Sequence, residues 1–299
     1  MKLKRSKRIV LEAPDGYSFG VSEEDSGELK IKLIPTVATE DSGNYTDPPI
    51  PEGWEYVEGD WNNGFTIQDS KGNQFVWVPV DFLDPNGTLD GSSCSEKFGR
   101  RNYQDGEFSD DGFSEELEGE LRKQWQSVQK YGGFYISRYN ISRSKGEAKS
   151  VKGAMPWTNI NWFDAMEAAK TFGDGVSVKS HLPYGAEYDS VLEWFIKSKA
   201  RTTDEIASDS TQWGNFWNTK DSPREVVKTG RCKEWSTNGI YDLAGNVDEW
   251  TQEKRHSCRV IRGGFYNNNG NNFPVAYRNY CNPNGNFGST GFRATLFLA

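Results

Sequence analysis

The sequence predicts a mixed α+β fold with long ordered loops, preceded by a small strand-rich appendage. Short alternating runs and amphipathic stripes both occur, which indicates strands and helices. Aromatic residues make up 14% of the chain, with 11 Trp, and so many large rings favour a domain in which side chains anchor loops as well as the core. An Asn-rich stretch near the C-terminus lies between two segments that read as buried strands. This stretch is therefore expected to be a folded, exposed surface.

Length and charge limit the classes of function. At 299 residues and 35% hydrophobic content, the chain can bury a sizeable core and is long for one domain. A net charge of -8 argues against nucleic-acid binding, because phosphate contacts require clustered Lys and Arg. The one basic run, at residues 2–8, is interpreted as a solvated terminus.

Targeting signals and cysteine pairs are both lacking in the sequence. No stretch approaches the length of a membrane span, and residues 1–14 lack the apolar core of a signal peptide. We therefore expect cytoplasmic synthesis, no membrane insertion and no export by the usual route. The cysteines are far apart and form no CxxC pair, so buried or incidental thiols are the default interpretation. They are Cys94, Cys232, Cys258 and Cys281.

The N-terminal part is predicted to be separate from the main domain. Residues 1–46 contain short alternating runs, such as Leu29–Leu33, and are expected to form the small β-rich appendage. Residues 47–53 are rich in Pro, which stiffens the chain and blocks helix formation, so they are interpreted as a linker. The main domain is then expected to span residues 54–299.

Local signals place the elements of the main domain in order. Two runs separated by a turn at residues 69–73 predict a hairpin over residues 65–80. Residues 84–111 read as a loop, and residues 134–141 alternate like a strand. Three helices are predicted: one that starts at Ser114 and buries Leu117, Leu121, Trp125 and Val128, one capped by Asn161 and stopped by Gly173, and one over residues 183–199 that buries Tyr188, Val191, Leu192 and Phe195.

Several short motifs resemble formylglycine-generating-enzyme-like domains, and they occur here in the order seen in that family. The motifs are FYISRY at 134–139, HLPYGAEY at 181–188, GIYDLAGNVDEW at 239–250, RGG at 262–264 and GFR at 291–293. Each is weak alone, and the combination is specific. The resemblance covers roughly residues 54–299 and implies a C-type lectin fold with two principal helices, small antiparallel sheets and long ordered loops.

That family contains both enzymes and binding proteins, so the fold does not decide the function. The enzyme uses two cysteines after its Gly-Gly strand to bind copper and activate oxygen. Counted from Gly264, those positions hold Asn268 and Phe273, and neither side chain is a thiolate that could ligate copper. Cys258 precedes the motif and Cys281 lies too far along. The catalytic interpretation is therefore disfavoured on chemical grounds.

The C-terminal stretch also resembles the variable proteins of diversity-generating retroelements, which include phage tropism determinants. In those proteins a reverse-transcriptase process alters adenines, and Asn codons of the AAC type can change to Tyr, Phe, Cys, Ser or Gly codons. These residue types fill most of residues 265–290, and framework positions Pro274, Ala276, Arg278, Pro283 and Gly291–Arg293 accompany them. The candidate ligand-binding residues are Tyr266, Asn267, Asn268, Asn269, Asn271, Asn272, Phe273, Tyr277, Asn279, Tyr280, Cys281, Asn282, Asn284, Asn286 and Phe287.

The composition of this stretch suits recognition. Tyr and Phe give large contact areas with few rotatable bonds, and Asn, Ser and Gly give adaptable hydrogen bonding. No Lys, Asp or Glu occurs between Arg262 and Ala299. The plainer alternative is that Asn and Gly are turn formers in a loop-rich fold. Cys281 has an equally plain alternative, a partly buried small hydrophobe.

A calcium site and the two histidines have competing interpretations. By resemblance to the enzyme's loop, Asn246 and Glu249 could supply oxygen ligands to a structural Ca²⁺ ion. Alternatively, Asn246 bonds to loop backbone and Glu249 pairs with an Arg, which is favoured because Asp248 stands where the family usually has Trp. His181 and His256 are expected to be structural residues. No other cofactor is predicted.

Together these observations predict a non-catalytic ligand-binding protein of the retroelement-variable type. Its variable C-terminal surface, residues 265–290, would recognise a protein or glycan receptor on a target cell. The N-terminal region would serve homo-oligomer assembly or attachment to a larger particle, such as a phage or prophage tail, and several copies would raise the effective affinity. The alternatives are an oxidase-like enzyme with a displaced active site and a structural phage component whose loops bind nothing.

Overall fold

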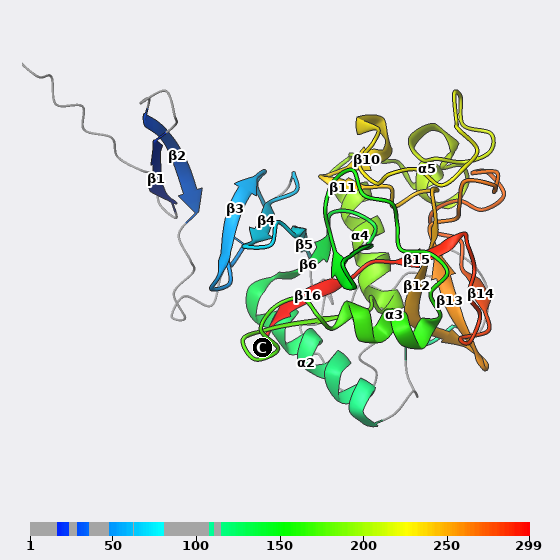
Figure 1. The fold of residues 1–299 in the computed structure, drawn as a ribbon, viewed down its shortest axis with the longest axis horizontal. Coiled ribbons are helices and arrows are strands. Elements are labelled where there is room, and N and C mark those ends of the chain that lie inside the picture. Colours follow the sequence, from blue (N-terminus) through cyan, green and yellow to red (C-terminus); the bar gives the residue numbers. More distant parts are fainter. Residues whose placement is uncertain (1–16, 24–28, 36–47, 62, 81–107, 111–114) are drawn as a thin grey trace, which may run out of the picture.

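The computed structural model describes residues 17–23, 29–35, 48–61, 63–80, 108–110 and 115–299 (Figure 1). In the N-terminal region, strands β1 (Tyr17–Glu23) and β2 (Leu29–Pro35) pair as an antiparallel hairpin, as the alternating runs predict. The expected cap at Ser114 and most of the loop at 84–111 lie outside the described residues. The domain boundary at 47–53 stays a prediction. Within that range, Ile50 is buried and the Tyr135 hydroxyl donates to the Pro49 carbonyl at 2.8 Å.

A six-stranded antiparallel sheet forms the centre of the main domain. The strand order is β3-β4-β5-β6-β16-β9. The last strand of the chain is therefore inserted between β6 and β9, which ties the C-terminus into the core. The strands are β3 (Trp54–Glu58), β4 (Thr66–Asp69), β5 (Gln74–Pro79), β6 (Gly133–Ser137), β9 (Val178–His181) and β16 (Thr295–Leu298).

The predicted hairpin at residues 65–80 is confirmed as β4 and β5. Its turn is set by Asp69, whose carboxylate accepts hydrogen bonds from the backbone N–H groups of Lys71 and Asn73 at 2.9 and 2.8 Å. Gly72 adopts a φ of 79°, a left-handed conformation that favours glycine. The turn chemistry therefore fixes the register of the pair.

The strand predicted over residues 134–141 is too long. In the structure β6 ends at Ser137 and residues 138 and 139 form a bend, although the Arg138 N–H still donates to the Gln74 carbonyl at 2.9 Å. The strand ends early because Asn140 is fully buried and its side-chain amide donates a hydrogen bond to Glu249 at 2.6 Å, whereas on a regular strand it would face solvent. The alternation also misleads, because all residues of β6 are buried and both faces of the sheet are covered.

Three main helices pack around this sheet, as predicted. They are α2 (Glu115–Tyr131), α3 (Trp162–Ala169) and α4 (Gly185–Lys197). Asn161 caps α3 by accepting a hydrogen bond from the Asp164 N–H at 2.9 Å. Asp110 serves α4, because its carboxylate accepts the N–H groups of Gly185 and Ala186 at 2.7 and 2.8 Å. A short helix, α5 (Thr203–Ala207), has no counterpart among the predicted elements.

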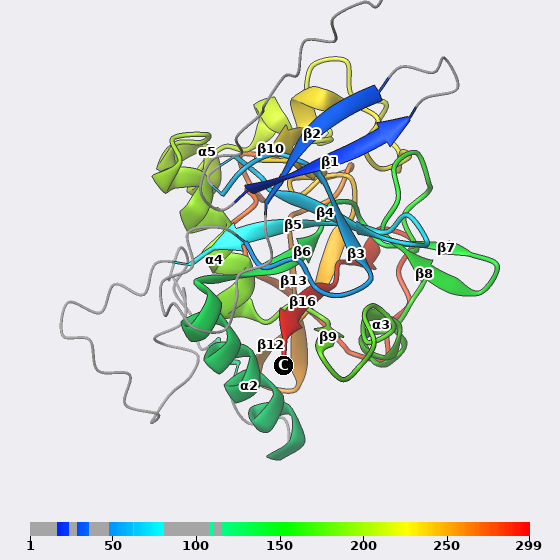
Figure 2. The ribbon, with the colours of Figure 1, turned by 90° about the vertical axis from the view of Figure 1, so that its left-hand side faces the viewer.

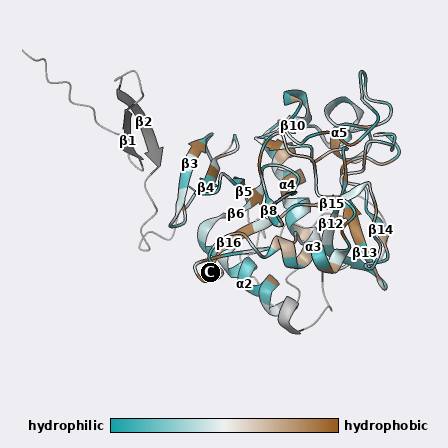
Figure 3. Cartoon of the chain, in the orientation of Figure 1, coloured by the Kyte–Doolittle hydropathy of each residue, from teal (hydrophilic) through white to brown (hydrophobic). Residues whose placement is uncertain are grey.

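The sheet lies between α4 and α2 on one side and α3 on the other (Figure 2). Alternate residues of β5 show the two faces: Val76 and Val78 belong to a cluster with α4, whereas Phe75 and Trp77 belong to a cluster with α3. Figure 3 draws α2 mainly in hydrophilic colours, which fits a helix with one buried stripe. In that stripe Leu121 and Val128 are buried. In the part of the chain that the structure describes, no helix is long and apolar enough to cross a membrane.

A second sheet carries the C-terminal segment. Its order is β14-β13-β12-β15, and β15 runs parallel to β12 while the other pairs are antiparallel. Strand β14 is at the edge. The strands are β12 (Asp248–Arg255), β13 (Cys258–Arg262), β14 (Asn279–Cys281) and β15 (Thr290–Phe292). Two-stranded pairs complete the domain: β7 (Ser142–Ser144) with β8 (Glu147–Lys149), and β10 (Ser236–Thr237) with β11 (Ile240–Tyr241).

Candidate functional site

The Asn-rich segment follows β13 and returns through edge strand β14 to β15. We use the term C-terminal face for the candidate ligand-binding residues within residues 265–290 that are listed above. Every one of them is exposed or half-buried. Most of the accompanying framework is buried, including Pro274, Ala276, Arg278 and Gly291–Arg293, whereas Pro283 is half-buried. The segment thus separates into accessible side chains and an internal frame.

The first half of the C-terminal face is a loop fixed at its base. The Asn268 side chain accepts a hydrogen bond from the Phe265 N–H at 3.1 Å. The backbone carbonyl of Asn268 accepts the Trp217 N–H at 2.8 Å. The Gly270 N–H donates to the Asn218 side chain at 2.9 Å. For Asn268 the turn-forming interpretation therefore describes the side chain well.

The second half is tied to the start of α3. Strand β14 pairs with β13, and the Trp162 N–H donates to the Pro283 carbonyl at 3.0 Å. The Asn159 N–H donates to the Phe287 carbonyl at 2.9 Å. The Asn282 side chain accepts the Asn284 N–H at 2.9 Å, a second local turn contact. Backbone bonds to elements far away in the sequence therefore hold this half in place.

Other Asn side chains of the face are not engaged in this way. Among the described residues, no hydrogen bond is made by the side chains of Asn267, Asn269, Asn272, Asn284 and Asn286. These amides are thus available to an external partner. Turn formation accounts for Asn268 and Asn282 but not for this second group.

A set of buried ion pairs lies under the face. Arg262 pairs with Asp189 at 2.9 Å and with Glu253 at 3.5 Å, and Arg278 pairs with Glu253 at 2.9 Å and also with Asp189. All four side chains are fully buried. Burial alone would lower the pKa of Arg278, but Asp189 and Glu253 outweigh it and raise the pKa above its ordinary value. The face is therefore fixed to α4 and β12 through charges that cannot be left unpaired.

The predicted calcium ligands occupy a second buried network. Glu249 Oε1 accepts hydrogen bonds from Asn140 Nδ2 and from Arg293 Nε, both at 2.6 Å. Asn246 Oδ1 accepts the Val227 N–H at 3.0 Å, and its amide donates to the Val227 carbonyl at 3.2 Å. Burial raises the pKa of Glu249 to about 7, although the Arg293 guanidinium lowers it.

These contacts match the hydrogen-bonding alternative for Asn246 and Glu249. Glu249 Oε1 and Asn246 Oδ1 already accept N–H groups, whereas Glu249 Oε2 is buried and has no hydrogen-bond partner among the described residues. Ca²⁺ requires six to eight oxygen ligands. Within the described residues, no group of three or more His, Cys, Asp or Glu side chains could hold a metal ion. The donor set around Asn246 does not fit calcium as it stands, and the calcium site stays a prediction.

Asn268 and Phe273, the two positions that the motif count assigns to the enzyme's copper cysteines, both lie near Gly264. A Cβ built on Gly264 would lie 3.0 Å from the Phe273 carbonyl oxygen and 3.5 Å from Asn268 Oδ1. An amide and a phenyl ring supply no thiolate there, so the residues do not fit copper. Burial, followed by Asp248 and Cys258, raises the pKa of the Cys281 thiol to about 11, which disfavours a reactive thiolate.

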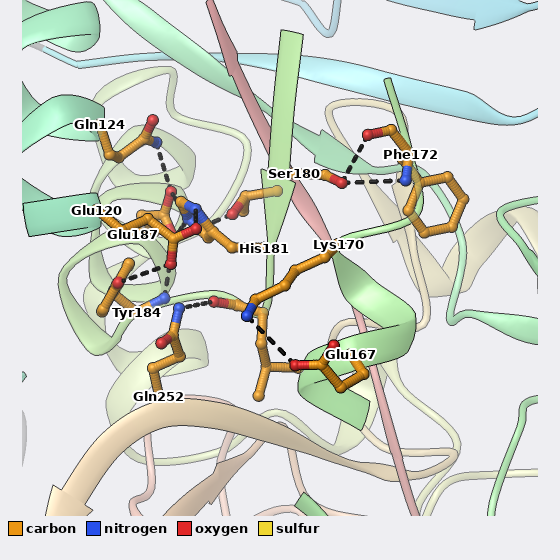
Figure 4. A network of polar contacts seen from close by, with 12 residues as sticks. Glu120, Gln124, Glu167, Lys170, Phe172, Ser180, His181, Tyr184, Glu187 and Gln252 are labelled. Carbon is orange, nitrogen blue, oxygen red and sulfur yellow. Dashed lines mark hydrogen bonds and ion pairs between the residues drawn. The ribbon is translucent and has the colours of Figure 1, made fainter. Parts of the chain in front are cut away.

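His181 belongs to a buried network that the sequence did not reveal (Figure 4). Its Nε2 lies 2.9 Å from Glu187 Oε2, and the same carboxylate accepts the Tyr184 N–H at 2.8 Å. Burial alone would lower the pKa of His181, but Glu187 and Glu120 outweigh it and raise the pKa. This network ties β9 to α4. His256 is exposed in the turn between β12 and β13, with a φ of 53°.

Trp217 and Arg224 border the C-terminal face, although neither is among its predicted residues. The Trp217 side chain is 42% exposed, and its backbone N–H bonds to Asn268 of the face. The Arg224 guanidinium lies 4.2 Å from the centroid of the Trp217 ring. The only available sequence signal was the cluster of aromatic residues in the 213–217 loop. Since both residues lie outside the Asn-rich stretch, they would be constant neighbours of a variable surface.

Comparison with known protein families identifies the family of this chain. The sulfatase-modifying factor enzyme 1-like domain, FGE-sulfatase, matches residues 100–296, and the chain belongs to this family. This confirms the family and the formylglycine-generating-enzyme-like, C-type lectin fold indicated by the motifs. No curated protein matches the chain.

Solved structures of low sequence identity are also similar. Treponema denticola variable protein 1 has 18% identity and a TM-score of 0.39, with 55% of this chain and 84% of that chain covered. PvdO from Pseudomonas aeruginosa has 15% identity and a TM-score of 0.46, with 81% and 100% covered. CarF has 16% identity and a TM-score of 0.40, with 56% and 87% covered.

Proposed function

We propose that the protein is a non-catalytic ligand-binding protein of the diversity-generating retroelement type, and that its C-terminal face is the recognition surface. One observation carries the proposal. Every candidate ligand-binding residue in the segment is accessible, whereas the charged framework residues Arg262, Arg278 and Arg293 are fully buried and paired. Most side chains on such a surface can change with little cost to folding, because other residues make the buried frame. Asn268, whose side chain accepts the Phe265 N–H, is an exception.

The chemistry of the face supports recognition of a macromolecule. Tyr280 and Phe287 are exposed aromatic rings, and unengaged amides such as those of Asn267 and Asn286 lie on the same segment. Rigid rings with adaptable hydrogen-bonding groups are the composition of antibody paratopes. The partner is a protein or glycan receptor on a target cell surface. Display of several copies, through the N-terminal region or on a phage or prophage tail, raises the effective affinity of a modest single site.

A library tests the recognition function directly. Codons for Asn, Tyr, Ser and Gly replace positions 267, 269, 272, 284 and 286, and yeast-displayed clones are sorted for binding to hen egg-white lysozyme as an arbitrary protein target. We expect most clones to fold and specific binders to be enriched. A library of equal size at the five exposed hairpin positions 143–147 is the matched control. Absence of enrichment, or equal enrichment in the control, would contradict the proposal.

The family also contains enzymes, so an oxidase-like activity is the alternative. That activity needs thiolates at the positions that Asn268 and Phe273 occupy. The purified protein is incubated with Cu(I) and with a cysteine-containing peptide, and copper content and peptide oxidation are measured. Stoichiometric copper with turnover of the peptide would favour the enzyme over the binding protein.

A further inference from the structure

A small cleft lies between helix α2 and the last strands of the six-stranded sheet. Its volume is about 340 Å³, and Lys123, Ser127, Lys130, Tyr131, Lys179 and Leu298 are among its lining residues. In Figure 1 this part of α2 lies near the C-terminal label, at the opposite side of the main domain from β14. The cleft is therefore separate from the C-terminal face.

Positive side-chain charge gathers at this cleft. Three lysines line it, and no lining side chain is acidic; the other lining residues are Gln126, Ser127, Tyr131, Leu298 and Ala299. This contrasts with the chain as a whole, which has a net charge of -8. Lys123, Ser127 and Lys130 follow one another at helical spacings of four and three along α2, so they share one side of the helix. Lys179 comes from the edge strand β9. Lysines from two separate elements thus line one cleft.

Ser127 supplies an independent indication of a ligand. Its side chain is only 5% exposed, and among the described residues its hydroxyl has no hydrogen-bond partner. A buried hydroxyl without a partner costs free energy, and such groups usually meet an acceptor. The acceptor that suits a cleft lined by three lysines is an anion.

We propose that this cleft is a binding site for a phosphoryl group. A phosphate dianion presents several strong acceptor oxygens, which would take the Ser127 hydroxyl hydrogen together with N–H groups of Lys123 and Lys179. Lys130 adds positive charge at the same cleft. The volume exceeds that of the phosphoryl group itself, so the site admits the group on a larger molecule. This site does not depend on the function proposed for the C-terminal face.

Titration calorimetry on the full chain, at constant ionic strength set with chloride, tests the site. Inorganic phosphate and glucose 6-phosphate are the two probes, and they distinguish the free anion from a phosphoryl group on a larger molecule. We expect saturable one-to-one binding of at least one probe. Glucose without phosphate is expected not to bind. Failure of both phosphate probes to bind at millimolar concentrations would overturn the proposal.

Three variants localise the binding. K123A/K179A is expected to abolish it, and S127A to weaken it about tenfold because a hydrogen bond to a charged group is lost. S127T keeps the hydroxyl and should restore most of the affinity. Ala is a good helix former, so S127A is expected to fold, which circular dichroism checks. The matched control is K220A/K228A, two lysines outside the cleft. Equal weakening by the control, or wild-type affinity in S127A, would overturn the site.

Discussion

Arg278 lies in the middle of the segment that carries the C-terminal face, yet its guanidinium is fully buried and pairs with Asp189 of helix α4. The residues on either side, Tyr277 and Asn279, are half-buried on the accessible surface. One framework side chain thus connects this accessible segment to the core of the domain. The stability of the surface should depend on this ion pair and not on the neighbouring Asn residues.

Removal of Arg278 is expected to destabilise the protein severely. R278A leaves Asp189 and Glu253 with less compensating charge in a buried site, and breaking a buried pair in this way costs about 3–5 kcal/mol. Urea denaturation measures the free energy of unfolding. R224A is the matched control, because Arg224 is exposed, and its effect should stay within about 0.5 kcal/mol. Equal stability of the two variants would show that the ion pairs do not hold the face.

Two neighbouring Asn residues of the face should respond differently to the same substitution. N268A loses the hydrogen bond that the Phe265 N–H donates to the side chain and is expected to cost about 1 kcal/mol. N267A removes an exposed amide that has no hydrogen bond among the described residues and should change stability by less than about 0.5 kcal/mol. Thermal unfolding of both variants measures the two changes in stability. An equal cost would mean that the face is built from turn residues throughout.

Asp248 makes stability depend on pH. Burial, followed by repulsion from Glu249, raises its pKa to about 8, although the Gly264 N–H lowers it. The folded state therefore holds a proton that the unfolded state releases near pH 4. Its contribution to stability is full below about pH 4 and is lost as the pH rises to about 8, at no more than about 1.4 kcal/mol per pH unit.

The variant D248N isolates this contribution. Denaturation is measured from pH 4 to pH 9, and the difference in free energy between D248N and the wild type should shift in favour of D248N as the pH rises. Groups that do not interact with Asp248 contribute equally to both proteins and cancel in the difference. Glu249 loses the repulsion from Asp248 in D248N, which shifts the difference in the same direction. Parallel curves would contradict the raised pKa of Asp248.

Trp217 should act as a constant anchor for ligands of the face. Its indole is 42% exposed beside Asn268, and Arg224 stacks on it at 4.2 Å. In binders selected from the library at positions 267, 269, 272, 284 and 286, W217A is expected to weaken binding about tenfold in most clones without loss of stability. V176A, at a 77% exposed position, is the control. Binding that is unaffected by W217A would restrict recognition to the Asn-rich segment.

The parts of the fold that the sequence predicts correctly are those with local signals. The hairpin β4–β5 follows from turn chemistry at Asp69, and α3 follows from its Asn161 cap and its apolar spacing. The extent of β6 was wrong, because the burial of Asn140 depends on Glu249, a residue distant in sequence. A strand pattern carries no information about such a partner.

The candidate site shows the same division. The accessible residues of the face all lie within one stretch of sequence, so composition and motif order could single that stretch out. The ion pair of Arg278 with Asp189 joins positions 89 residues apart, and neither residue carries a local sign of the other. The lysine cleft is similar, since Lys123 and Lys179 come from different elements that only the fold brings together.

Sequencing of the encoding locus across a natural population tests the recognition function most directly. The coding segment for the C-terminal face is compared among isolates, together with any adjacent near-copy and reverse transcriptase gene. We predict substitutions confined to adenine positions at residues such as Asn267, Tyr277 and Asn284, with the codons of Arg262, Arg278 and Arg293 unchanged. An invariant segment without a near-copy would contradict the account and leave a family member whose exposed Asn residues do not serve variable recognition.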